Sequence, residues 1–139
     1  MPIEDLARDD VVTADADTSV GDLASTMDER NVGSVVITRD EEPVGIVTDR
    51  DLTLRVLAGS ADPADATAED VMSSDLCTID RGEGFYRAAE LMSDHGVRRL
   101  PVSDDGELVG IITADDLSEL LADEQEQVAE IIRAQRPPY

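Results

Sequence analysis

The sequence predicts an α/β fold made of two tandem copies of one β-α-β-β-α unit, followed by a C-terminal helix. A shift of 65 residues superimposes the chain on itself without a gap: Val44-Gly45-Ile46 falls on Val109-Gly110-Ile111, and Asp51-Leu52 falls on Asp116-Leu117. Self-similarity of this extent indicates a tandem duplication. At 139 residues and 41% hydrophobic composition, the chain is long enough for one body that contains both copies.

The helices and strands of the first copy are predicted from the periodicity of its hydrophobic residues. A short extended segment, Val11–Thr13, precedes a helix that begins after the N-cap Thr18-Ser19. In this helix, apolar side chains recur at spacings of three and four residues: Val20, Leu23, Ala24 and Met27. Two strands, Ser34–Thr38 and Val44–Thr48, follow around a polar turn, and a second helix begins at Asp49.

The second copy repeats this order of elements. Its extended segment is 76–79, and its first helix starts at Phe85 and ends at Gly96, a residue suited to the left-handed position after a helix. Its strands are 99–103 and 108–113. Gly59–Ala66 predicts a linker, and Thr67–Asp70 predicts a capped turn. We place the first repeat at 3–60, the second at 67–122, and the C-terminal helix with a short tail at 123–139.

A last helix is predicted to continue beyond the second copy. Its apolar residues follow helical spacing: Leu117, Leu120, Leu121, Val128, Ile131 and Ile132. The opposite face is strongly acidic. We expect the apolar stripe to pack on its own domain or on a second copy of the chain.

Acidic side chains dominate the composition. The chain carries 33 Asp+Glu against 11 Lys+Arg, a net charge of −22, and every one of its basic residues is Arg. This pattern resembles the proteins of salt-accumulating halophiles, because molar salt shortens the Debye length to about 3 Å and so screens the repulsion. The alternative is an acidic protein of a mesophile. Duplex DNA and anionic membranes would repel this surface, so we expect neither as a partner.

The location of the protein is predicted from what the sequence lacks. No run of about 18 apolar residues could span a membrane, and no signal peptide opens the chain. The single cysteine, Cys77, excludes an internal disulfide. We therefore expect a soluble cytoplasmic protein.

Catalytic and metal-binding residues are not predicted. The only histidine, His95, falls at a helix end beside Gly96, where the helix dipole accounts for it. Cys77 lies in an apolar strand, as expected of a small core residue. No group of residues has metal-ligand spacing. We predict that the protein is not an enzyme and requires no cofactor.

One motif in each copy suits a ligand. Gly45–Asp51 and Gly110–Asp116 both contain a glycine, a short buried strand, and then Thr and Asp three residues apart where a helix begins. One interpretation is a capping box, which is purely structural. In the other, the helix N-terminus and the Thr hydroxyl bind a phosphate, while the Asp carboxylate accepts hydrogen bonds from two ribose hydroxyls. This combination suits a nucleotide better than a bare anion.

The two motifs resemble the adenosine-binding signature of the CBS domain, Gly-hydrophobic-hydrophobic-Thr-x-x-Asp. Asn31–Val36 and His95–Val102 resemble the middle strand of that family. The resemblance extends from about Ile3 to Leu121 and identifies the chain as a stand-alone CBS domain pair, or Bateman module, similar to those of halophilic archaea. It implies a ligand among AMP, ADP, ATP and S-adenosylmethionine, or no ligand.

The resemblance also implies two pockets in the cleft between the copies. In one, Asp51 holds the ribose and Thr48 faces the phosphate, and the adenine is flanked by Val32, Gly33, Ser34, Thr78 and Ile79. In the other, Asp116 and Thr113 take the same two roles, and the adenine is flanked by Thr13, Ala14 and Val97.

Arg98 and Arg99 are implied at the phosphate ends of both pockets. Adjacent arginines favour an anion, although in so acidic a chain they could pair with surface carboxylates instead. Gly33-Ser34 occupies the matching positions of the first copy. We therefore expect the two pockets to be unequal.

Two classes of function follow. The first is a regulatory module that binds AMP, ADP or ATP between the copies and transmits a conformational change to a separate protein, whose identity the sequence does not reveal. The alternatives are a structural dimerisation or docking module without a ligand, and a module that binds S-adenosylmethionine. In each case we expect a homodimer formed through the helices.

Overall fold

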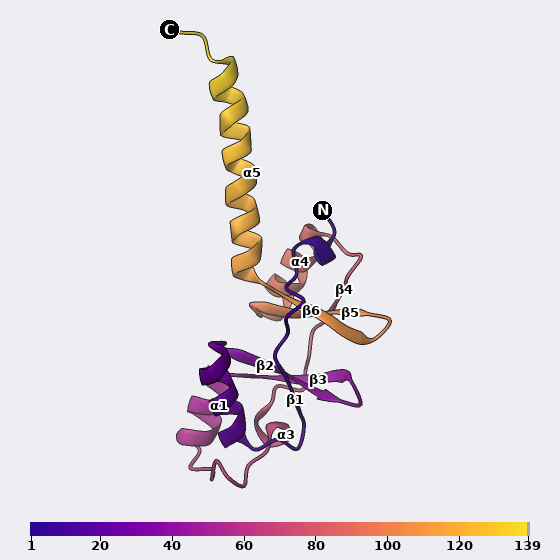
Figure 1. Cartoon of the computed structure of the whole chain (residues 1–139), viewed down its shortest axis with the longest axis vertical. Coiled ribbons are helices and arrows are strands. Elements are labelled where there is room, and N and C mark those ends of the chain that lie inside the picture. The colour runs from indigo at the N-terminus through magenta and orange to yellow at the C-terminus, as the bar shows by residue number, and fades with distance from the viewer. Residues whose placement is uncertain (139) are drawn as a thin grey trace.

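The computed structural model describes residues 1–138 and shows two α/β halves and a long C-terminal helix (Figure 1). Each half contains a three-stranded sheet, in the order β1-β2-β3 or β4-β5-β6. In both sheets the first two strands are parallel, and the last two form an antiparallel hairpin. The predicted α/β fold, with two repeats and a C-terminal helix, is confirmed.

The first half follows the predicted order of elements. It consists of β1 (Thr13–Asp15), α1 (Val20–Arg30), β2 (Ser34–Arg39), β3 (Glu42–Thr48), α2 (Asp49–Asp51) and the π-helical segment η2 (Leu52–Leu57). The Ser19 hydroxyl caps α1, because it accepts a hydrogen bond from the Asp22 N–H at 3.2 Å. β1 begins later than the predicted segment 11–13, at the residue where Thr13 pairs with Val36 of β2.

The second half repeats these elements with a longer last helix. It consists of β4 (Ile79–Asp80), α4 (Phe85–His95), β5 (Arg99–Asp104), β6 (Glu107–Thr113) and α5 (Ala114–Gln135). As predicted, α4 ends at Gly96, which has a φ of +62°. The predicted turn between the halves is α3 (Ala68–Val71), and its counterpart near the N-terminus is the 3₁₀ helix η1 (Ile3–Asp5).

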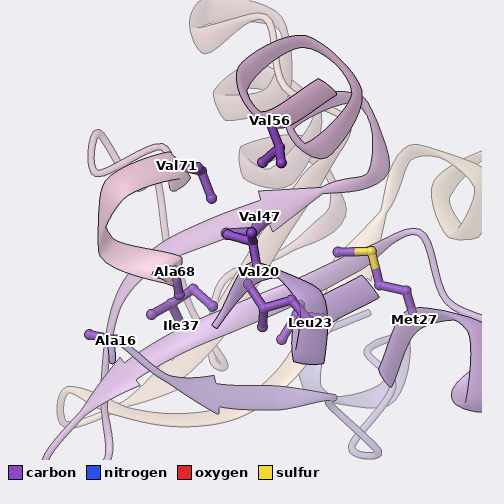
Figure 2. Packing of buried hydrophobic residues seen from close by; sticks show 10 residues of the cluster. Ala16, Val20, Leu23, Met27, Ile37, Val47, Val56, Ala68 and Val71 are labelled. Carbon is purple, nitrogen blue, oxygen red and sulfur yellow. The ribbon is translucent and has the colours of Figure 1, made fainter. Parts of the chain in front are cut away.

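The short helix that precedes each half packs into the core of the other half. Ile3 of η1 is fully buried in the core of the second half, and the N-terminus accordingly lies beside α4 (Figure 1). Ala68 and Val71 of α3 lie in the core of the first half (Figure 2). The ranges 3–60 and 67–122 are thus repeats of sequence, whereas each packed core combines residues from both ranges.

After each short helix, the chain pairs briefly with the last strand of the half that it enters. Ser73 and Ile46 of β3 exchange two backbone hydrogen bonds, of 3.0 and 3.2 Å. Arg8 and Ile111 of β6 do the same, both at 2.9 Å. We call residues 3–8 and 68–73 the exchanged segments.

The glycine of each motif is required by this pairing. A Cβ on Gly45 would lie 3.0 Å from the Ser73 carbonyl oxygen and would also meet the Met72 side chain. A Cβ on Gly110 would lie 2.9 Å from the Arg8 carbonyl oxygen. Only glycine lets the exchanged segment approach the strand this closely.

Helix α5 extends beyond the second half for most of its length (Figure 1). Leu117 is buried, but the distal apolar side chains are more than half exposed: Leu121, Val128, Ile131 and Ile132. The expectation that this part of the stripe packs on its own domain is wrong, because the helix leaves the sheet after its first turns. No helix in residues 1–138 has the length and apolar composition needed to cross a membrane.

The ion pairs lie mostly at the surface. Examples are Arg39–Glu69 at 3.1 Å and Arg133–Glu126 at 2.8 Å, in which all the side chains are more than half exposed. Exposed pairs contribute about 0–1 kcal/mol each. With 33 carboxylates and 11 arginines, most carboxylates have no cation of their own.

We therefore expect the melting temperature to rise steadily from low salt to about 2 M KCl. Screening removes the repulsion, and each kcal/mol gained raises the melting temperature of a domain of this size by about 3–5 °C. Thermal unfolding followed by circular dichroism checks this. A melting temperature that does not change with KCl would contradict it.

Candidate functional site

Each motif closes into a capping box at the start of a helix. The Thr48 hydroxyl accepts a hydrogen bond from the Asp51 N–H at 3.2 Å, and Asp51 Oδ2 accepts one from the Thr48 N–H at 2.9 Å. Thr113 and Asp116 form the same two bonds at 3.2 and 2.9 Å. The structural interpretation of the motif is therefore confirmed, and any ligand must use the groups that the capping box leaves free.

The first capping box leaves a donor and an acceptor. The Thr48 hydroxyl accepts from Asp51, so its own proton remains available to donate. Asp51 Oδ1 lies 3.9 Å from Arg55 Nε, beyond hydrogen-bond distance. Arg55 instead donates to the carbonyl oxygens of Val71 and Met72. A hydroxyl proton and a carboxylate oxygen are thus both available to a ligand.

A cavity of about 370 Å³ adjoins this first motif, and we call it the first cavity. Besides Thr48 and Asp51, its lining includes Leu76, Cys77, Val97, Arg98 and Arg99 of the second half. This volume lies within the usual range of small-molecule pockets. The first cavity therefore joins apolar walls to the polar groups of the motif, across the two halves.

A cavity of about 650 Å³ adjoins the second motif, and we call it the second cavity. Its lining includes Thr113 and Asp115 near the start of α5, the segment Val32-Gly33-Ser34 of the first half, and Arg99. The residues before β1 also contribute, from Arg8 to Val12. The two cavities are therefore related by the repeat but differ in size and lining.

The structure distributes the predicted pocket residues differently between the cavities. Val32, Gly33 and Ser34, predicted beside Thr48, line the second cavity, and Val97, predicted beside Thr113, lines the first. The halves pack with β3 against β6, so the start of each middle strand faces the end of the other half's hairpin. Each cavity is thus built from a motif of one half and a middle strand of the other.

Five other predicted residues line neither of these cavities: Thr13, Ala14, Thr78, Ile79 and Asp116. Ile79 is buried in the core, and Thr13 and Ala14 are paired with β2 inside the sheet. Thr78 lines a separate surface hollow beside Val44. The cavity walls come instead from residues just before each sheet begins: Val11, Val12, Leu76 and Cys77.

The two predicted arginines have different surroundings. Arg99 lines both cavities, and its Nη2 would lie 3.5 Å from a Cβ on Gly33, so it reaches the first half. Arg98 lines the first cavity alone and donates to Asp115 Oδ1 at 3.2 Å. Both partners of that pair are exposed, so Arg98 makes the surface pairing that was the alternative, and salt screens it.

Arg8 was not among the predicted residues, yet the structure places it on the second motif. Its Nη2 and Nε donate to Asp116 Oδ1 at 3.1 and 3.3 Å. Asp116 Oδ2 already closes the capping box, and this side chain is only 9% exposed. Comparison of the two copies could have identified Arg8, because the shift of 65 residues aligns this charged residue with the small, neutral Ser73.

The cysteine and the histidine have local partners. Burial raises the pKa of the Cys77 thiol, an effect that nearby Arg87 opposes and Asp75 reinforces. The thiol is therefore protonated near neutral pH. His95 Nδ1 lies 3.0 Å from the Leu91 carbonyl oxygen at the end of α4. Among residues 1–138, no three His, Cys, Asp or Glu side chains are placed to share a metal ion.

Comparison with known sequences identifies the repeat. The model of the CBS domain matches residues 3–58 and 68–123. The CBS domain-containing protein YhcV of Bacillus subtilis is 33% identical over 116 residues, which cover 84% of this chain and 82% of YhcV. An uncharacterized protein of Methanopyrus kandleri, MK0525, is 38% identical over 119 residues, and the match spans 84% of this chain but only 61% of that protein.

Solved structures agree with the sequence comparison. The CBS domain pair of protein MJ0100, in complex with 5′-methylthioadenosine and S-adenosyl-L-methionine, has a TM-score of 0.80 at 25% identity and covers 89% of this chain and 98% of its own. Hypoxic Response Protein I with two coordinated zinc ions has a TM-score of 0.79 at 28% identity and covers 86% and 98%. This chain therefore belongs to the CBS domain family, and its two halves form a CBS domain pair.

Proposed function

We propose that the chain is a regulatory module that binds an adenine nucleotide in the first cavity and passes a conformational change to a partner protein. The observation behind this proposal is that the Thr48 hydroxyl proton and Asp51 Oδ1 are both free, and that these two residues line a cavity that spans both halves. The structure of MJ0100 with two adenosyl compounds supports this class of ligand.

Each part of a nucleotide has a matching group in this cavity. The ribose hydroxyls would donate to Asp51 Oδ1. The phosphate would accept from the Thr48 hydroxyl and from Arg99, which forms no ion pair with residues 1–138. The adenine would lie between apolar side chains such as Leu76 and Val97. These contacts suit AMP, ADP or ATP.

The signal would pass through the contacts between the halves. A ligand on Asp51 and Arg99 touches both halves and so favours one arrangement of them over others. Arg55 strengthens the link, because the helix that follows Asp51 is tied through Arg55 to the Val71 carbonyl oxygen at 2.8 Å. Nucleotide binding would therefore act on the exchanged segment 68–73, and through it on the surface presented to a partner.

S-adenosylmethionine is a second candidate ligand, and one observation favours it. The first cavity is lined by Asp49, Asp51 and Asp75 as well as by arginines. Carboxylates attract the positive sulfonium and amino groups of that molecule.

Titrations with AMP, ATP and S-adenosylmethionine in molar KCl would rank the affinities of the three ligands. A docking module would bind none of them.

The first test separates binding from capping. Asp51→Ala should weaken AMP binding about ten- to a hundredfold, because it removes the charged acceptor of the ribose hydroxyls, worth about 1.5–3 kcal/mol. The same variant should lose about 1 kcal/mol of unfolding free energy through the lost cap. Calorimetric titration and urea unfolding measure the two effects.

Asp70→Ala is the matched control. Asp70 caps α3 through the Thr67 N–H at 2.9 Å and lines neither cavity. The Asp70→Ala variant should lose about as much unfolding free energy as Asp51→Ala, but it should bind AMP like the wild type. Equal AMP affinity in Asp51→Ala and Asp70→Ala would show that the motif is only a cap.

The second test concerns Arg99. Arg99→Ala should weaken ATP binding more than adenosine binding, because the arginine contacts phosphate, and added salt should narrow the difference. Arg39→Ala removes an arginine that lines neither cavity, so it is the control for the loss of one positive charge. If Arg99→Ala lost affinity for ATP and for adenosine by the same factor, Arg99 would not recognise the phosphate.

We also propose a homodimer in which the distal part of α5 pairs with a second copy. Its apolar stripe is exposed, as are Leu57 of η2 and Tyr86 of α4. Charge favours an antiparallel pair of α5 helices, since Arg133 and Arg136 follow an N-terminal half that is acidic. Such a pair would set the arginine end of each helix against the acidic end of the other.

Light scattering in molar KCl should therefore give about twice the monomer mass of 14.9 kDa. Val128→Glu should shift the protein to the monomer, because it places a charge in the apolar stripe. Ala122→Glu adds the same charge on the opposite face of α5 and should leave the dimer intact. A wild-type mass near that of the monomer would contradict the proposal.

A further inference from the structure

We propose that Arg8 closes the second cavity to nucleosides, so that the chain has one adenosine site rather than two. This inference rests on the proposed function of the first cavity and concerns the occupancy of the second. The second cavity is the larger one and contains Thr113 of the second motif. Its volume would admit a nucleotide, yet the carboxylate needed for the ribose is already occupied.

The two aspartates proposed as ribose acceptors, Asp51 and Asp116, differ in the partners of their carboxylate oxygens. Asp116 Oδ1 accepts from Arg8 Nη2 at 3.1 Å and Nε at 3.3 Å, and Asp116 Oδ2 accepts from the Thr113 N–H at 2.9 Å. Both oxygens are therefore engaged. Asp51 Oδ1 accepts no hydrogen bond from residues 1–138, and its basic neighbour, Arg55 Nε, lies 3.9 Å away. A ribose can reach Asp51 directly, but it must displace a charged partner from Asp116.

The exchanged segments explain how a single residue produces this difference. Arg8 pairs with Ile111 through its backbone, and Ser73 pairs with Ile46 in the same way, 65 residues further along. The two residues therefore stand at equivalent places beside the two motifs. Arginine is long enough to reach the carboxylate from there, and serine is not.

The burial of the Asp116 side chain strengthens its bond to Arg8. The Asp116 side chain is 9% exposed, whereas that of Arg8 is 65% exposed. A charge-assisted bond to a carboxylate with so little access to water is stronger than an ordinary surface pair. A nucleoside offers neutral hydroxyls in exchange for the guanidinium, and so it competes poorly for Asp116.

The repeat suggests the experiment, because Arg8 and Ser73 occupy equivalent positions and each can be replaced by the other residue. AMP stoichiometry is measured by calorimetric titration at fixed molar KCl. The wild type should bind one AMP per chain. Arg8→Ser should bind two, and the double variant Arg8→Ser/Asp51→Ala should keep one site, in the second cavity. Ser73→Arg should weaken binding in the first cavity at least tenfold.

Arg39→Ser is the matched control for charge, because it removes one arginine and the exposed pair with Glu69 outside both cavities. It should still bind one AMP. Thermal unfolding shows whether each variant is folded. Two AMP per wild-type chain, or one per Arg8→Ser chain, would overturn this inference and leave the proposed function standing. No AMP binding by either protein at millimolar concentration would overturn the proposed function, and this inference with it.

Discussion

The exchange of two short segments between the halves is the constraint on which the rest of the structure depends. Ile3 completes the core of the second half, and Ala68 completes the core of the first. Neither half therefore has a full core without a segment that is close in sequence to the other half. The exchange ties the halves together through buried apolar contacts, which are the dominant stabilising term in a chain whose surface charges repel one another.

The candidate site is a consequence of that exchange. Where each exchanged segment leaves its core, it pairs with the last strand of the hairpin, and this close approach requires the glycine of the motif. Three residues after that glycine, the same strand ends at a threonine that caps a helix. The strand pairing, the helix start and the cavity are thus consecutive parts of one stretch of chain, and this places the Thr and Asp side chains at the contact between the halves.

Duplication makes the two motifs alike, but it does not make the cavities equal. Both capping boxes have the same hydrogen bonds and almost the same distances. The differences lie in side chains that the motif does not include: Arg8 against Ser73, and Arg98-Arg99 against Gly33-Ser34. A paired CBS module can therefore keep two symmetric frameworks and still present two sites of different chemistry, because site chemistry depends on a few side chains that are free to diverge.

The repeat, the order of the elements, the caps and the motif residues could all be predicted from the sequence, because they depend on local periodicity and on neighbours within a few positions. The Ser19 cap, Gly96 and the two Thr-Asp pairs are all of this local kind. The half that each short helix completes, and therefore the middle strand that faces each motif, became visible only in the folded chain. The folded chain also showed that Arg8 lies on Asp116, 108 residues away in sequence, and that α5 leaves the body with its stripe exposed. Contacts of this kind depend on how separate surfaces pack, and no local pattern in the chain encodes that choice.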